Sequence, residues 1–202
     1  MTGSSQDAPD PPRTDGGRRE QVLAAALDTF VRYGYRKTSM EQIARAATIS
    51  RPGLYLLFGS KQELFAAAVI GDLDRSLAAA TLALADPDRP VHTRLLDAFD
   101  HWTGRYIGPM SNEVNTMAME YADLLPGITA YPARFAALLE AAVADSTDLA
   151  GGRRSSAVTQ TLISTSIGIK HQVTTREEFL RRMATAIGLF VDRVPEKHRE
   201  SG

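Results

Sequence analysis

The chain has 202 residues, of which 44% are hydrophobic and 23% are charged, and it contains no cysteine. This length and composition suffice for one large or two small domains with an apolar core, and the lack of cysteine excludes disulfides, thiolate metal sites and a cysteine nucleophile. The net charge of -1 conceals an uneven distribution, because residues 18–61 carry +5 whereas residues 1–17 carry -2 and residues 62–202 carry -4. This basic segment, residues 18–61, predicts a polyanionic partner for the first part of the chain only.

The first 17 residues, MTGSSQDAPDPPRTDGG, contain no apolar run and are rich in Pro, Asp, Ser and Gly. This composition predicts a disordered N-terminal arm and does not fit a signal peptide. No later stretch of the sequence approaches the roughly 18 unbroken apolar residues of a membrane span. We therefore expect no membrane partner and a cytoplasmic location.

The first predicted helix covers residues 18–33, where Leu23, Leu27 and Phe30 recur at helical spacing. Gly34 ends this helix, and Tyr35 is then placed to fold back on Phe30 as in a Schellman motif. A second helix begins at a capping box, formed either by Ser39 with Gln42 or by Thr38 with Glu41.

Two more helix starts follow at short intervals. Ser50 caps a helix that runs to about Phe58, and Pro52 is tolerated in its first turn because a first-turn residue has no helical partner for its N–H. Gly59 ends that helix, and Ser60 with Glu63 forms a capping box for a long fourth helix. Two short helices joined by a turn of about four residues, with an earlier helix packed across them, are typical of a helix-turn-helix unit.

The helix after Ser50 has the side chains that a DNA-reading helix needs. Arg51 opens it, Pro52 and Gly53 form a low first turn, and Tyr55 projects one turn later. Such a helix end fits into a major groove, where arginine binds guanine O6 and N7. The alternative is a small helical bundle that carries an incidental arginine.

The sequences VLAAALDTFVRYGYRKTSMEQ and IARAATISRPGLYLLFGSKQELF resemble the DNA-binding domain of TetR/AcrR-type transcriptional regulators over about residues 18–65. Two positions depart from the family pattern. Thr48 replaces the glycine of an Ala-Gly-Val turn, so a positive φ there would carry a cost. Leu57 stands where the family often has a phosphate-contacting Tyr or His.

This resemblance implies a set of residues that contact DNA. They are Thr38, Ser39, Arg51, Pro52, Gly53, Tyr55 and Lys61. Ser39 and Lys61 stand at predicted helix N-termini, where free N–H groups and the helix dipole favour phosphate. For Thr38 and Ser39 a capping role is sufficient by itself, so the DNA role is an addition to it.

The remainder of the chain is predicted to be helical as well. A stripe of Leu95, Phe99, Trp102 and Tyr106 ends at Gly108-Pro109, and further helices are expected at about residues 112–125, 132–145, 155–172 and 176–193. The predicted fold is all-α. A three-helix helix-turn-helix domain occupies residues 18–64, and a larger helical ligand-binding and dimerisation domain occupies residues 65–202.

The resemblance implies a homodimer that forms through the last two long helices as a four-helix bundle. The candidate interface residues are Leu162, Ile163, Ile169, Phe179, Met183, Ile187 and Phe190. The alternative is that this apolar stripe is core within one chain.

A concentration of aromatic and Met side chains in the middle helices is typical of small-molecule pockets. The candidate ligand residues are Phe99, Trp102, Tyr106, Met117, Tyr121, Phe135 and His171. Plain core packing explains such a stripe equally, and His171 fits a surface or capping position.

These features predict a homodimeric, ligand-responsive transcriptional regulator, a repressor that a small apolar or amphipathic effector releases from a palindromic operator in double-stranded DNA. The alternative is a helical module that senses a small molecule and acts through a protein partner without specific DNA binding. We expect no enzyme activity, no cofactor and no metal site. The sequence has no metal-ligand His pair, no phosphate-binding loop spacing and no nucleophile elbow.

Overall fold

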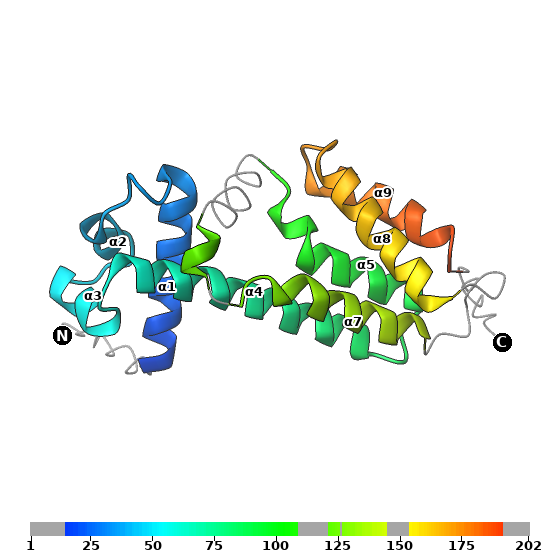
Figure 1. Cartoon of the computed structure of the whole chain (residues 1–202), viewed down its shortest axis with the longest axis horizontal. Coiled ribbons are helices and arrows are strands. Elements are labelled where there is room, and N and C mark those ends of the chain that lie inside the picture. Colours follow the sequence, from blue (N-terminus) through cyan, green and yellow to red (C-terminus); the bar gives the residue numbers. More distant parts are fainter. Residues whose placement is uncertain (1–14, 109–120, 126, 145–153, 192–202) are drawn as a thin grey trace, which may run out of the picture. The chain divides into compact units, whose positions relative to one another are not determined.

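The structure is a computed structural model that describes residues 15–108, 121–125, 127–144 and 154–191. All elements of these ranges are helices: α1 (Asp15–Tyr33), α2 (Met40–Ala46), α3 (Arg51–Leu57), α4 (Lys61–Ala85), α5 (Val91–Trp102), the 3-10 helices η1 (Gly104–Tyr106) and η2 (Ala122–Leu124), α7 (Ala130–Ala144), α8 (Ser155–Lys170) and α9 (Arg176–Gly188) (Figure 1). The prediction of an all-α fold is confirmed. The chain divides into two compact units, residues 1–68 and 69–202.

The helix α1 begins at Asp15, three residues before its predicted start. Residues 1–14, which make up most of the predicted arm, lie outside the described residues. The end of α1 is as predicted, because Gly34 has a φ of 79° and its N–H donates to the Phe30 carbonyl at 2.8 Å. The Tyr35 ring packs 5.7 Å from Phe30 and 4.9 Å from Phe65, centroid to centroid, so the chain reversal is part of the apolar core of the first unit.

Side-chain caps define the starts of α2 and α3. The capping box of α2 is the Ser39 and Gln42 pair: the Gln42 N–H donates to Ser39 Oγ at 3.2 Å, and the Ser39 N–H donates to Gln42 Oε1 at 2.8 Å. Ser50 Oγ accepts from the Gly53 N–H at 3.1 Å and caps α3. Between the two helices Thr48 has a φ of 56°, so a β-branched residue holds the left-handed position of this turn at a cost of about 1–2 kcal/mol.

The second unit differs from prediction at the end of α5. The predicted stripe runs as one helix to Tyr106, but α5 ends at Trp102 and the chain continues as the 3-10 helix η1. Gly104 lies in a tight space at this point, since a Cβ there would stand 2.5 Å from Asp100 Oδ1 and 3.2 Å from the Phe179 ring. The missing side chain lets the start of α9 approach η1 closely, which an unbroken α5 with a larger residue would prevent.

The core of the second unit forms where α7 packs on α8 and where α9 packs on α5 and α8. Phe99, Phe135, Leu139, Leu162 and Phe179 are among its buried side chains. The bounds of α7, α8 and α9 agree with the predicted helices within a few residues at each end, except that α9 stops at Gly188. The helix predicted at residues 112–125 falls mainly on residues 109–120, outside the described ranges. Among the described helices, none is both long and apolar enough to cross a membrane.

Candidate nucleic-acid interface

Four residues from two successive turns of α3 are exposed and make up its exposed face: Arg51, Pro52, Tyr55 and Leu56. Leu54 and Phe58 are buried in the core of the first unit. Because residues four apart share one side of a helix, Arg51 stands beside Tyr55 and Pro52 beside Leu56. The Arg51 guanidinium lies 5.7 Å from the centroid of the Tyr55 ring, so these two side chains are already in contact range.

Leu56 is the residue of this face that sequence reasoning missed. Leu57 was noted only as a departure from the family pattern and is partly buried, whereas Leu56 is 89% exposed. The signal was present in the sequence, because Leu54 and Phe58 define the inward side of α3 and Leu56 falls opposite to it.

Thr38 is buried, which does not fit its predicted side-chain contact with DNA. Its side chain is only 2% exposed, and its hydroxyl donates to the Gly34 carbonyl at 2.8 Å. The residue therefore holds the connection between α1 and α2, and its burial removes it from the candidate contact set. Ser39, the next residue, is exposed while it caps α2.

Lys61 is half-buried and makes contacts within the first unit in addition to its predicted place at a helix N-terminus. Its ammonium donates to the carbonyls of Tyr35 and Thr38, at 3.1 Å each, and lies 4.5 Å over the Tyr35 ring. The side chain thus ties the start of α4 to the connection between α1 and α2. An ammonium has three N–H donors and two of them bind these carbonyls, so the predicted DNA role of Lys61 stays a prediction.

Gly53 lies in the first turn of α3, against the cap of that helix. A Cβ at this position would stand 3.0 Å from Ser50 Oγ, the oxygen that accepts the Gly53 N–H. A side chain here would be in tight contact with the cap, and Ser50 would have to shift by a few tenths of an ångström to admit it. The predicted approach of Gly53 to DNA is a separate, untested role.

Further basic side chains of the first unit lie near this face or at the surface. The Arg19 guanidinium, from the first turns of α1, stands 4.9 Å over the ring of Phe58 at the end of α3. Arg45 on α2 is exposed and pairs with Glu41 at 3.2 Å. An exposed ion pair of this kind contributes little to stability, so Arg45 remains free to exchange its partner.

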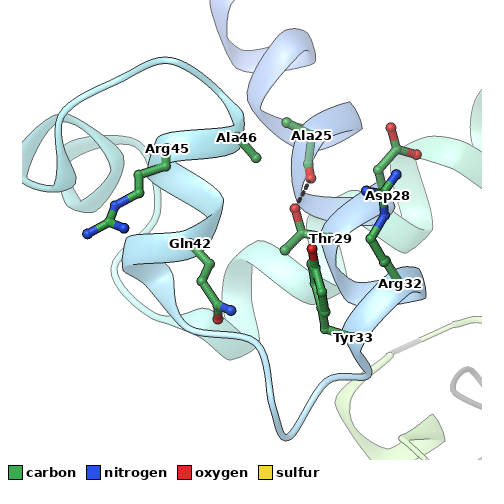
Figure 2. A pocket seen from close by; sticks show the side chains of 8 residues that line it. All are labelled: Ala25, Asp28, Thr29, Arg32, Tyr33, Gln42, Arg45 and Ala46. Carbon is green, nitrogen blue, oxygen red and sulfur yellow. Dashed lines mark hydrogen bonds between the residues drawn. The ribbon is translucent and has the colours of Figure 1, made fainter.

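A surface depression of about 390 Å³ lies between α1 and α2 (Figure 2). Figure 2 shows Asp28, Arg32 and Tyr33 of α1 on one side of it, and Gln42 and Arg45 of α2 on the other. The Thr29 hydroxyl in its wall donates to the Ala25 carbonyl at 2.6 Å. The lining combines one carboxylate with two guanidinium groups, so it offers no single sign of charge to a ligand.

Three of the candidate ligand residues form one aromatic cluster in the second unit. Trp102 stacks on Phe135 with a centroid distance of 4.7 Å and an interplanar angle of 15°. Phe99 meets Phe135 edge-on at 5.6 Å. Phe99 and Phe135 are buried and Trp102 is half-buried, so only Trp102 keeps surface to offer.

The other ligand candidates do not join this cluster. The Tyr106 hydroxyl donates to Asp72 Oδ2 at 2.5 Å, and Arg105 donates to Asp72 Oδ1 at 3.0 Å, so η1 is fastened to α4. Burial, and then the Asp72 carboxylate, raise the pKa of Tyr106 to about 12. His171 is exposed at the end of α8, Tyr121 is half-buried, and Met117 lies outside the described residues. Asp72 and Arg105 are 33 residues apart in the sequence, so no local pattern predicts that they pair.

Most of the predicted dimer residues are core residues of a single chain. Leu162, Ile169, Phe179, Met183 and Ile187 are buried inside the second unit, whereas Ile163 and Phe190 are half-buried. For the five buried residues the alternative of intramolecular core is correct, because α8 and α9 bury them against each other and against α5 and α7. Ile167 on α8 is more than half exposed and was not in the predicted set.

The first unit matches a known protein family and curated relatives in sequence. The model for bacterial regulatory proteins of the tetR family matches residues 22–68, which include every predicted DNA-contact residue. The HTH-type transcriptional regulator RutR of Escherichia coli is 39% identical over 66 residues, 33% of this chain and 31% of RutR. The HTH-type transcriptional activator FasR of Mycolicibacterium smegmatis is 40% identical over 67 residues, again 33% of this chain and 31% of the relative. These matches span about a third of the length of each curated relative.

Solved structures extend the likeness to most of the chain. SmeT, the repressor of the Stenotrophomonas maltophilia multidrug efflux pump SmeDEF, superposes with a TM-score of 0.65 at 20% identity, over 87% of this chain and 91% of SmeT. A TetR-family regulator from Mesorhizobium loti gives a TM-score of 0.64 at 17% identity, over 89% of this chain and 100% of that chain. At such identities the likeness shows the fold alone.

Proposed function

Because this chain belongs to the TetR family of bacterial regulatory proteins, we propose that it is a homodimeric transcriptional regulator that binds a DNA operator and responds to a small-molecule effector. The exposed face of α3 is the observation that carries the proposal. It presents Arg51 and Tyr55 to solvent from within the basic segment, where the net charge is +5. The first unit would bind DNA and the second would bind the effector and the partner subunit.

The chemistry of this face suits a major groove. The planar guanidinium of Arg51 donates two N–H groups in parallel, as guanine O6 and N7 require. Tyr55 adds a hydroxyl that can bind a base edge or a phosphate, and Pro52 adds an apolar surface. Exposed basic side chains such as Arg19 and Arg45 would bind phosphate and release counterions, which supplies affinity without sequence preference.

A two-fold dimer presents two identical reading helices, so its operator should be a near-palindrome. The half-sites are expected to lie about one helical turn or more apart, ~34 Å or beyond. Selection of bound sequences from a random DNA pool, followed by footprinting, measures this directly. Recovery of a single asymmetric site that one protomer occupies would contradict the proposal.

The effector is proposed to be apolar or amphipathic, because Trp102 keeps surface beside the buried rings of Phe99 and Phe135. An effector that favours the DNA-free form must, by linkage, weaken operator binding by the same factor by which DNA weakens effector binding. In a thermal-shift screen, compounds that raise the melting temperature should therefore also release operator in a gel shift. Stabilising compounds that leave operator affinity unchanged would contradict this mechanism.

Repression is the sense of regulation that needs the fewest contacts, since a dimer on an operator that overlaps a promoter excludes polymerase without touching it. The position of the selected site relative to the promoter tests this sense, as a site upstream of the promoter fits an activator. The alternative function, a sensing module that acts through a protein partner, predicts that no palindromic DNA is retarded in a gel shift at any effector concentration.

A further inference from the structure

Leu56 has no structural task in the first unit. Among the described residues it is the most exposed large hydrophobic side chain, at 89%, on a helix whose neighbours Leu54 and Phe58 are fully buried. Covering an apolar side chain that is exposed to water lowers the free energy of the complex. Its position on α3 leaves it available to a partner outside the unit.

The surroundings of Leu56 identify the chemistry of that occupant. Pro52 lies one turn before Leu56 on the same side of α3, so the two residues form an apolar strip. Arg51 and Tyr55 form a polar strip directly beside it, with the guanidinium 5.7 Å from the ring. An occupant must offer acceptors to arginine and an apolar group to leucine within one narrow surface, and the basic segment around it favours a polyanion.

The major groove of DNA meets both demands. Base edges there present acceptors, and thymine presents the apolar C5-methyl group, which side-chain carbons can contact. We propose that Leu56 is a specificity-determining residue that contacts a thymine methyl group in each half-site, with Pro52 beside it. This inference rests on the proposed function and adds a base contact to it.

The helix geometry also gives the spacing of the two contacts. Leu56 follows Arg51 by five positions, which is about 7.5 Å along an α-helix at ~1.5 Å per residue. At ~3.4 Å per base pair, this distance corresponds to about two base pairs. Because a helix in the major groove is inclined to the DNA axis, this is an upper value, and the thymine is expected within about two base pairs of the base that Arg51 reads.

Replacement of thymine by deoxyuridine removes only the methyl group and tests the proposal. Each thymine of the selected operator is replaced in turn, symmetrically in both half-sites, and the dissociation constant is measured for the wild-type protein and for Leu56→Ala. One position should cost the wild-type protein about fourfold per half-site, the effect expected for one buried methyl-sized group. The same replacement should cost Leu56→Ala nothing.

Two further variants serve as controls. Leu82 is 75% exposed on α4 in the second unit, so Leu82→Ala should retain the wild-type response to every deoxyuridine. Leu56→Met keeps an apolar side chain and should retain the methyl dependence even if the alanine variant folds poorly. The melting temperature of each variant checks the fold.

The possible failures are distinguishable. If the wild-type protein selects no operator from a random pool, the proposed function and this inference fall together. If an operator is selected but wild type and Leu56→Ala respond equally to every deoxyuridine, only the inference is overturned. Equal weakening of operator and random DNA by Leu56→Ala would assign the side chain to the sugar-phosphate backbone, and unchanged DNA binding would assign it to a protein partner; either result overturns the thymine contact.

Discussion

Arg51→Ala is expected to weaken operator binding by about 1–3 kcal/mol per half-site and to relax the base preference at one position of each half-site. The reason is that a bidentate arginine pair discriminates guanine from other bases, and alanine leaves both guanine acceptors without a donor. Arg51 is exposed, and its guanidinium lies beside the Tyr55 ring. The melting temperature should therefore change little. Titrations of operator and random DNA, together with a repeated selection on the variant, measure the effect.

Arg45→Ala provides the matched control for the loss of one positive charge. Arg45 is exposed on α2, and its ion pair with Glu41 is a surface pair within one helix. This variant should weaken operator and random DNA to a similar extent and leave base preference unchanged. If Arg51→Ala behaves in the same way as Arg45→Ala, α3 is not the element that reads base edges.

Lys61→Met is expected to lower the free energy of unfolding of the first unit by about 1.5–3 kcal/mol, the range for hydrogen bonds to a charged group. Methionine retains an apolar stem but removes the ammonium that donates to the Tyr35 and Thr38 carbonyls. For a protein of this size, a loss of 1 kcal/mol lowers the melting temperature by roughly 2–4 °C. Thermal unfolding followed by circular dichroism measures the change.

Lys37→Met is the appropriate control, because Lys37 is an exposed lysine on the same connection and its loss removes the same charge. It should keep the wild-type melting temperature. The salt dependence of DNA binding then separates the two roles of Lys61. If its remaining donor binds phosphate, Lys61→Met lowers the salt slope by about one per protomer. A variant with wild-type stability and a reduced slope would show that the ammonium serves DNA alone.

The local features of the first unit were predictable because their partners lie close in the sequence. The Ser39 and Gln42 capping box, the Ser50 cap and the turn at Gly34 each involve atoms within four residues of one another. The outward direction of Leu56 likewise follows from its spacing to Leu54 and Phe58. Arg51 and Tyr55 stand three residues from these buried side chains, so their exposure is known from the structure and not from the spacing. The left-handed conformation at Thr48 was predictable from the resemblance to a family turn.

The tertiary structure alone decided which polar and apolar groups are available to a partner. The Lys61 ammonium binds carbonyls 23 and 26 residues away, and the Tyr106 hydroxyl binds Asp72 34 residues away. Met183 and Ile187 look the same in the sequence whether they pack on their own chain or on a second subunit, and they are buried in their own chain. Sequence spacing shows which residues share a helix face, since that depends on helical periodicity, but what covers the face depends on segments that only folding brings together.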